Sequence, residues 1–241
     1  IHGDLNLTLN KLLPILMKKS IVKNNPWMAR LKSLKNQYKD TSSYDDDTVN
    51  PRSVLKELRK AIPNNTIITT DVGQHQMWSS LYFDIYSPGT FFTSTGLGTM
   101  GFGFPAALGA KVGKPNLPSI CISGDGSFNM VEQALATAVL DNIPAIVIIL
   151  NNGSLGMVAQ WQRVFYNKRY LGINLQNSPD FVKIAQAYGA EGIRVQSLPE
   201  FNKAVKNALK SEVATVIDVP IDPEADVFPF VAPGTSLADM I

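Results

Sequence analysis

The feature that most restricts the fold of this sequence is an alternation of short aliphatic runs with longer amphipathic segments between residues 50 and 220. The short runs are rich in isoleucine, valine and threonine and are bounded by polar or turn-forming residues, which is typical of buried β-strands. We expect strands at Ile67–Thr70, Phe91–Thr93, Ser119–Ser123, Ala145–Leu150, Gly192–Val195 and Thr215–Val219.

The segments between these runs place apolar residues at helical spacing. We expect helices there at residues 74–83, 104–112, 127–140, 155–165, 179–188 and 199–209. Strands that alternate with helices favour a mostly parallel sheet with helices on both faces. The predicted fold class is therefore α/β, with three layers in the order α/β/α.

The main domain is expected to span residues 50–241. Asn50-Pro51 has the pattern of a helix start, a capping residue followed by proline at the first helical position. Residues 1–20 are expected to form a short N-terminal helical segment, and residues 21–49 a polar linker with a short helix from Trp27 to Tyr38. Because the chain begins with Ile1 and not with methionine, we expect it to be a piece of a longer protein.

The composition excludes some classes of function. The net charge is only +2, from 22 basic and 20 acidic residues, so no nucleic-acid partner is expected. The longest apolar run, Ile143 to Leu150, contains Pro144 and is too short to span a bilayer, so no membrane association is expected. The single cysteine, Cys121, lies in an apolar run and favours a reducing, cytoplasmic compartment.

Three polar clusters directly follow three of the expected strands. They are Asp71 to His75, Gly124 to Ser127 and Asn151 to Ser154. In open α/β sheets, ligands bind in the crevice outside the carboxyl ends of the strands. We therefore expect the three clusters to lie together at one edge of the sheet.

The cluster Gly124-Asp125-Gly126-Ser127 is typical of a phosphate site that also holds a metal ion. Glycines let the backbone approach a ligand, and the following helix offers free N–H groups to a phosphate. Asp125 would repel that phosphate unless a divalent cation lay between them. The side chain of Asn152 and the carbonyl of Ser154 could add two further oxygen ligands, which suits Mg²⁺.

Either half of this pattern alone is commonly a simple turn. The combination of Gly-Asp-Gly, 24 intervening residues and Asn151-Asn152 is specific to thiamine-diphosphate enzymes. The segment from Gly124 to Tyr170 resembles the C-terminal catalytic domain of the acetolactate synthase (acetohydroxyacid synthase) family. The segments 71–78, 96–103 and 178–181 share this resemblance, which covers about residues 50 to 233, and residues 1–20 resemble the end of the family's middle domain.

The resemblance implies a role for each matching residue. The implied metal ligands are Asp125, Asn152 and Ser154. Met77, Val158 and Trp161 are implied to line the substrate pocket. The implied contacts of thiamine diphosphate are Gln74, His75, Gly98, Thr99, Met100, Asp125, Gly126, Ser127, Asn152, Gly153, Ser154, Leu155, Gly156 and Met157. His75 could instead serve only the start of its helix, and Met100, Met157 and Trp161 could be plain packing residues.

The implied reaction is that of a transferase of branched-chain amino acid biosynthesis. Pyruvate is decarboxylated and joined to a second 2-ketoacid, either pyruvate or 2-ketobutyrate. In the family, the catalytic glutamate comes from the pyrimidine-binding domain of a neighbouring subunit, so no complete catalytic set is expected in this chain. FAD is expected in the full-length enzyme, bound mainly outside this chain. The enzyme is expected to be a homo-oligomer, with a possible regulatory small subunit. The alternatives are another thiamine-diphosphate-dependent decarboxylase or carboligase, or an inactive cofactor-binding module.

Overall fold

The computed structural model describes residues 2–19, 25–37 and 48–240. The chain divides into two compact units, Ile1–Ser43 and Tyr44–Ile241. Among the described residues, no helix combines the length and the hydropathy needed to span a bilayer.

In the described part of the first unit the helices are α1 (Leu5–Met17) and α2 (Pro26–Gln37). The side chain of Asp4 caps α1 by accepting a hydrogen bond from the backbone N–H of Leu7 at 2.9 Å. The helix expected from Trp27 corresponds to α2, although Tyr38 lies outside the described residues. Much of the expected linker also lies outside them, so the boundaries at residues 20 and 49 stay predictions.

The second unit is built around a six-stranded sheet in which every strand pair is parallel. The strand order is β2-β1-β3-β4-β6-β5. The strands are β1 (Ile67–Thr70), β2 (Phe91–Thr93), β3 (Ser119–Gly124), β4 (Ile146–Asn151), β5 (Glu191–Arg194) and β6 (Thr215–Pro220). All six expected strands are present, with ends shifted by no more than one residue.

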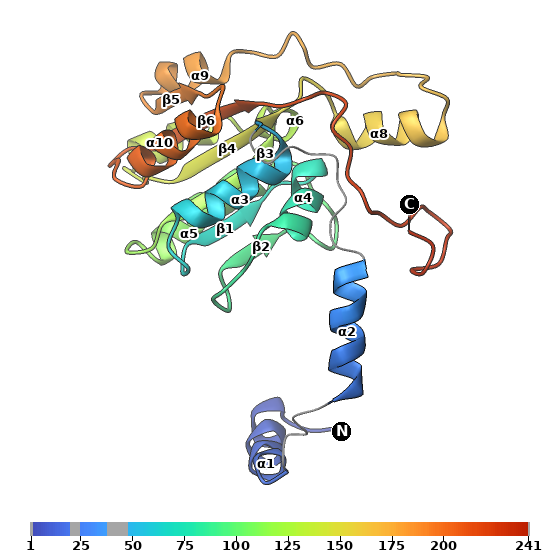
Figure 1. Ribbon diagram of the computed structural model, residues 1–241. Helices are drawn as coiled ribbons and strands as arrows, with labels where there is room; N and C mark the ends of the chain where they lie inside the picture. Colours follow the sequence, from blue (N-terminus) through green and yellow to red (C-terminus); the bar gives the residue numbers. More distant parts are fainter. Residues whose placement is uncertain (1, 20–24, 38–47, 241) are drawn as a thin grey trace. The chain divides into compact units, whose positions relative to one another are not determined.

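Helices cover both faces of this sheet, as Figure 1 shows for α3 and α5. They are α3 (Pro51–Ala61), α4 (Gln74–Tyr82), α5 (Gly103–Gly113), α6 (Asp125–Phe128), α7 (Ala134–Leu140), α9 (Phe181–Tyr188) and α10 (Leu198–Ala208). Helix α8 (Gly156–Phe165) extends beyond the sheet. Successive residues of a strand point to opposite faces. Accordingly, Ile120 and Ile122 pack with α3, α4 and α10, whereas Cys121 packs with α5, α7 and α9. The predicted three-layer α/β/α fold is confirmed.

The expected start of the main domain agrees with the structure. The Asn50 side chain accepts a hydrogen bond from the Ser53 backbone N–H at 2.9 Å, and the Ser53 hydroxyl accepts one from the Asn50 N–H at 3.1 Å. This reciprocal capping box starts α3, with Pro51 at the first helical position. Val54, Leu55 and the rest of its apolar face are thereby directed at the sheet.

One expected helix, over residues 127–140, is interrupted in the structure. It consists of α6 and α7, separated by consecutive turns over residues 129–133. There the backbone bonds run over three residues, as from Val131 N–H to the Phe128 carbonyl at 2.9 Å and from Ala134 N–H to the Val131 carbonyl at 2.9 Å. Phe128, the last residue of α6, is fully buried and its ring contacts Phe104 and Phe181.

The strand order creates a crevice between β1 and β3. From β1 the chain continues to β2 on one side, whereas β3 lies on the other side. Such a reversal of strand order is where open α/β sheets bind ligands, outside the carboxyl ends of the strands. The clusters that follow β1, β3 and β4 are all at this edge, as expected.

Candidate functional site

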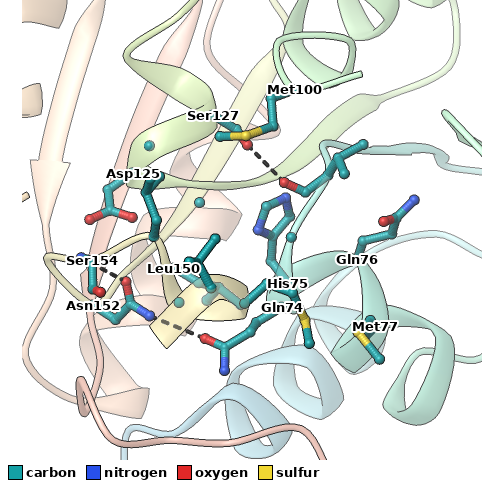
Figure 2. Close-up of a pocket in the computed structure, with 18 of the residues that line it drawn as sticks. Gln74, His75, Gln76, Met77, Met100, Asp125, Ser127, Leu150, Asn152 and Ser154 are labelled. Atoms are coloured by element: carbon teal, nitrogen blue, oxygen red, sulfur yellow. Dashed lines mark hydrogen bonds between the residues drawn. The ribbon is translucent and has the colours of Figure 1, made fainter. Parts of the chain in front are cut away.

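A cavity of ≈ 270 Å³ lies at the carboxyl ends of β1, β3 and β4 (Figure 2). Most residues that we expected at the cofactor line it: Gln74, His75, Gly98, Met100, Asp125, Gly126, Ser127, Asn152, Ser154, Leu155, Gly156 and Met157. Two of the expected substrate-pocket residues, Met77 and Val158, also line it. The three polar clusters therefore surround one cavity.

Three expected residues do not line this cavity. The backbone N–H of Thr99 donates to the Ser94 hydroxyl at 3.1 Å, and Thr99 is exposed. Gly153 forms the turn after β4 with a φ of 65°, a conformation that favours glycine. Trp161 lies instead on a second cavity, described below.

The cavity has further lining residues that our sequence reasoning did not assign to the cofactor. They are Val72, Gly73, Gln76, Trp78, Gly124 and Leu150. Val72, Gly73 and Gly124 belong to the predicted polar clusters, and Gln76 directly follows one of them. Leu150 could have been found as the apolar residue that precedes the asparagine pair.

Asp125 is the only acidic residue that lines the cavity among the residues that the structure describes. It is 2% exposed, and its Oδ2 atom has no hydrogen-bond partner. Burial raises the pKa of Asp125 to about 6, while backbone N–H groups, including those of Gly126, Gly153 and Ser154, act in the opposite direction. A buried carboxylate oxygen without a partner is costly unless a cation or a donor binds it.

Asn152 and Ser154 lie beside Asp125 on one side of the cavity (Figure 2). The Oδ1 atom of Asn152 accepts a hydrogen bond from the Ser154 backbone N–H at 3.0 Å. The turn is anchored by hydrogen bonds to residues 173–175, from Leu155 N–H to the Ile173 carbonyl at 2.8 Å and from Leu175 N–H to the Gly153 carbonyl at 2.9 Å. A carboxylate, an amide oxygen and a backbone carbonyl, the ligand types of a hard-oxygen site, thus lie on the same side of the cavity.

This donor set suits a hard divalent cation. Among the described residues, no group of three or more His, Cys, Asp or Glu side chains could hold a metal. A site with Asp125, Asn152 and a backbone carbonyl would therefore need further oxygens from a ligand or from water. Mg²⁺ binds in this way, through one or two carboxylates together with phosphate oxygens.

His75 lies on the opposite side of the cavity and is 5% exposed. Burial lowers the pKa of His75 to about 4, although Asp71 raises it, so the imidazole is neutral at neutral pH. Its Nε2 atom is buried without a hydrogen-bond partner. The first N–H groups of α4 and α8 have no partner within their helices and also lie beside the cavity, which suits an anionic group.

A second cavity of ≈ 650 Å³ is formed by α8 and the loop that follows it. Its lining includes Trp161, Tyr166 and Tyr170. Met157 and Val158 line both cavities, so the two adjoin along α8. The Trp161 ring is 40% exposed and makes an edge-to-face contact with Phe165 at a centroid separation of 6.2 Å.

Replacing Asp125 with asparagine is expected to change stability in a pH-dependent way in the metal-free protein. The pKa is raised from 3.8 to about 6 on folding, so the folded state binds the proton more tightly than the unfolded state. The cost of ionised Asp125 is absent below about pH 4 and complete above about pH 6, where it is on the order of 2–3 kcal/mol. In urea unfolding, the free energy of unfolding of the variant relative to that of the parent should rise by this amount as the pH is raised from 4 to 7.5. A pH-independent difference would contradict the prediction.

Comparison with known proteins identifies the family. The family model described as thiamine pyrophosphate enzyme, C-terminal TPP binding domain, matches residues 71–219. A probable acetolactate synthase large subunit from Methanococcus aeolicus is 42% identical over 255 residues, which cover 100% of this chain and 42% of that protein. The acetolactate synthase isozyme 2 large subunit of Escherichia coli is 38% identical over 240 residues, which cover 100% of this chain and 43% of that protein. The chain thus spans less than half the length of these relatives.

A solved structure of similar fold is also that of a thiamine diphosphate-dependent enzyme. The thiamine diphosphate-dependent 4-hydroxybenzoylformate decarboxylase of Rhodococcus jostii matches 77% of this chain and 34% of its own, with a TM-score of 0.69 and 28% identity. The family match begins at Asp71 and ends at Val219, so it includes all three clusters around the cavity. The chain therefore belongs to the family of C-terminal thiamine pyrophosphate-binding domains of thiamine pyrophosphate enzymes.

Proposed function

We propose that this chain carries the thiamine-diphosphate and Mg²⁺ site of an acetolactate synthase. The observation that carries the proposal is the partnerless, buried Oδ2 atom of Asp125 beside the Asn152–Ser154 turn. The identity of 42% and 38% to proteins named as acetolactate synthase large subunits favours this activity over others of the same family.

In this proposal Asp125, the side-chain oxygen of Asn152 and the carbonyl of Ser154 hold Mg²⁺. Asp125 would be neutralised by the bound ion, and the free N–H groups at the N-termini of α4 and α8 would bind the diphosphate. A Cβ atom at Gly126 would lie 2.7 Å from the Leu155 side chain and 3.0 Å from the Leu175 side chain, so a larger residue there would require both side chains to move.

In this proposal the side chain of His75 and the backbone N–H of Gln74 would bind the diphosphate from the other side of the cavity, since the Gln74 amide is occupied by Gln160, Ala225 and Asn152. A neutral imidazole adds no charge there, and its partnerless Nε2 atom is available as a hydrogen-bond donor or acceptor. Gly98 and Met100 would lie against the aminopyrimidine, next to the exposed Thr99. When bound, thiamine diphosphate supplies the carbon centre at which one 2-ketoacid loses CO₂ and is joined to a second.

Pyruvate and 2-ketobutyrate are the proposed substrates, and they enter beside Met77, Val158 and Trp161. Among the described residues, none of the cavity-lining residues is a glutamate. We propose that the activating glutamate comes from the pyrimidine-binding domain of a neighbouring subunit in a homo-oligomer. FAD and a regulatory small subunit would bind outside this chain.

A chimeric subunit tests this function. The 42% of the Methanococcus aeolicus protein that matches this chain is replaced by it, and acetolactate is measured after incubation with pyruvate, thiamine diphosphate and Mg²⁺. We expect acetolactate from the chimera and none from this chain alone. Benzoylformate is supplied in parallel, because the decarboxylases with similar structures act on such acids. Benzoylformate decarboxylation without acetolactate formation would favour a decarboxylase instead.

Trp161→Leu in the same chimera is expected to reduce the preference for 2-ketobutyrate over pyruvate by about ten-fold or more. The indole lies on the second cavity, next to Met157 and Val158, where it can pack against the extra methylene of the longer ketoacid. The measurement is the product ratio with both ketoacids present, together with the melting temperature. An unchanged ratio with a lower melting temperature would leave Trp161 as a packing residue.

A further inference from the structure

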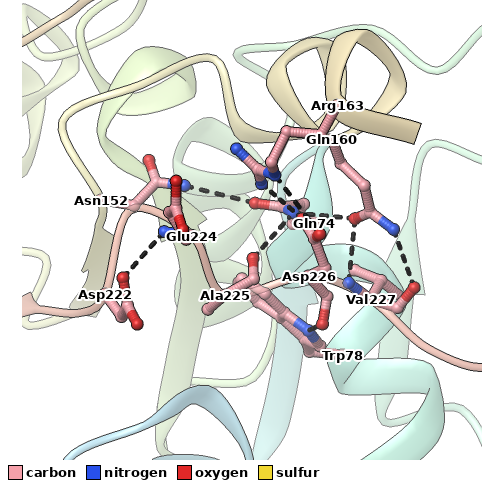
Figure 3. Close-up of polar contacts among 10 residues, drawn as sticks. All are labelled: Gln74, Trp78, Asn152, Gln160, Arg163, Asp222, Glu224, Ala225, Asp226 and Val227. Atoms are coloured by element: carbon pink, nitrogen blue, oxygen red, sulfur yellow. Dashed lines mark hydrogen bonds and ion pairs between the residues drawn. The ribbon is translucent and has the colours of Figure 1, made fainter. Parts of the chain in front are cut away.

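Three side-chain amides form a hydrogen-bonded chain from the segment 225–227 to the cavity (Figure 3). Gln160, on α8, is fully buried and contacts Val227 through both ends of its amide. Gln74 follows, and its Nε2 atom donates to Gln160 Oε1 at 2.9 Å and to the Ala225 carbonyl at 3.0 Å. Asn152 is the third member, and its Nδ2 atom donates to Gln74 Oε1 at 3.2 Å.

The orientation of these three amides is set by the backbone of Val227. The Val227 N–H can only donate, and it donates to Gln160 Oε1 at 2.9 Å. The Val227 carbonyl can only accept, and it accepts from Gln160 Nε2 at 2.9 Å. A side-chain amide has one donor end and one acceptor end, so the backbone of a single residue fixes which way the Gln160 amide points.

That orientation is passed on to the other two amides. Because Gln160 presents its oxygen and Ala225 its carbonyl, Gln74 must direct Nε2 at both. Gln74 Oε1 then faces the cavity and can accept only from a donor, so Asn152 must direct Nδ2 at it. The Oδ1 atom of Asn152 is thereby turned to the opposite side, where Asp125 lies and where it also accepts a hydrogen bond from the Ser154 N–H at 3.0 Å.

We propose that Gln160 is a positioning residue for the metal site, acting through Gln74 to hold the Asn152 oxygen toward the cation. This inference rests on the proposed Mg²⁺ site and adds a residue that does not line the cavity. Hydrogen bonds behind a metal ligand commonly fix its orientation and contribute to affinity. The same buried amides in reversed orientation would present an N–H group to the cation.

The segment that sets the direction is itself tightly held. Arg163, one residue beyond Gln162 on α8, forms an ion pair with Asp226, and the side chains are 11% and 18% exposed. The indole Nε1 atom of Trp78 donates to the Asp226 carbonyl at 3.5 Å. Residues 225–227 are thus fixed to α8 on one side and to α4 on the other, so the backbone groups that orient Gln160 are well placed (Figure 3).

The test compares Gln160→Met in the parent and in an Asn152→Asp background. With saturating thiamine diphosphate, Mg²⁺ is titrated into the chain by calorimetry. We expect Gln160→Met to weaken Mg²⁺ binding by about ten-fold in the parent. A carboxylate at position 152 has two equivalent oxygens and needs no orientation, so the same substitution should cause no loss there. Equal losses in both backgrounds, or no loss in the parent, would overturn the proposal.

Gln162→Met is the matched control for the titration. Gln162 lies two residues further along α8. Like Gln160 with Val227, it binds both backbone groups of one residue: its Oε1 accepts from Leu171 N–H at 3.0 Å and its Nε2 donates to the Leu171 carbonyl at 3.1 Å. It has no hydrogen bond to Gln74 or Asn152 among the contacts described. Mg²⁺ affinity should be unchanged in this variant. A loss of Mg²⁺ affinity equal to that of Gln160→Met would show a general effect of substitutions in α8. It would contradict the proposed relay, which is the series of hydrogen bonds from Gln160 through Gln74 to Asn152.

A second measurement needs no ligand. Hydrogen exchange of the Asn152 Nδ2 protons is followed by ¹⁵N NMR in the metal-free chain, and we expect it to be faster in Gln160→Met than in the parent and in Gln162→Met. Unchanged exchange would overturn the relay even if Mg²⁺ binds. If the parent shows no Mg²⁺-dependent binding, the proposed function fails, while the relay is still decided by the exchange rates.

Discussion

Replacing Asp125 with alanine is expected to abolish Mg²⁺-dependent binding of thiamine diphosphate. Asp125 offers the only carboxylate at the cavity within the described part of the chain, and its Oδ2 atom has no protein partner. Without it, the cation would lose its one anionic protein ligand and the diphosphate its link to the turn at Asn152. Loss of residues behind a metal ligand already costs about 10- to 100-fold in affinity, so we expect more than about 100-fold here.

Calorimetry with thiamine diphosphate, with Mg²⁺ and with chelator, measures this effect. Asp141→Ala is the matched control, because Asp141 is an exposed aspartate at the end of α7, away from the cavity. The affinity of Asp141→Ala for thiamine diphosphate should equal that of the parent. Unchanged affinity in Asp125→Ala, with a parent that binds, would remove Asp125 from the site.

The pH dependence of binding should have the same origin. The pKa of Asp125 in the metal-free protein is raised to about 6 by burial. Below this pH a proton occupies the carboxylate and competes with the cation, since metal ligands must be deprotonated. Mg²⁺ affinity is therefore expected to fall as the pH is lowered through 6 and to be level above it. An affinity that stays level down to pH 5 would contradict this.

Much of the fold could be predicted from the sequence because its signals are local. The strand β4 is an aliphatic run that ends at Asn151, β3 has an apolar centre from Ile120 to Ile122, and Asn50-Pro51 forms the helix cap that its residues suggest. The break between α6 and α7 was not predicted. It directly follows Phe128, whose ring contacts Phe104 and Phe181, residues that are distant in sequence and meet only in the folded chain.

In the candidate site, too, some residues could be predicted from the sequence and others could not. Asp125 and Asn152 could be predicted because each directly follows a strand, and parallel strands end at one edge. The contact of Gln160 with Val227 could not, since it joins a helix to a backbone segment that lies 67 residues away. Backbone groups have no sequence signature, so the residues that orient Gln74 and Asn152 became visible only with the fold.

Gly156→Ala is expected to weaken Mg²⁺-dependent cofactor binding about 10- to 100-fold, although alanine is the better helix former. A Cβ atom at Gly156 would lie 2.0 Å from Gln74 Oε1 and 2.5 Å from Asn152 Nδ2. The hydrogen bond between these two side chains thus occupies the space that the new methyl group would take. Both amides must move, and with them the Asn152 oxygen that is proposed to contact the cation.

Gly109→Ala is the control for this substitution. Gly109 lies within α5, and a Cβ atom there would meet nothing within 4 Å. This change should therefore raise stability by about 0.5–1 kcal/mol, because alanine loses less backbone entropy than glycine in a helix. Gly156→Ala should instead lose both stability and Mg²⁺ affinity. If it gains stability like Gly109→Ala and keeps its Mg²⁺ affinity, then the pair of Gln74 and Asn152 can shift freely, and their fixed geometry does not determine metal binding.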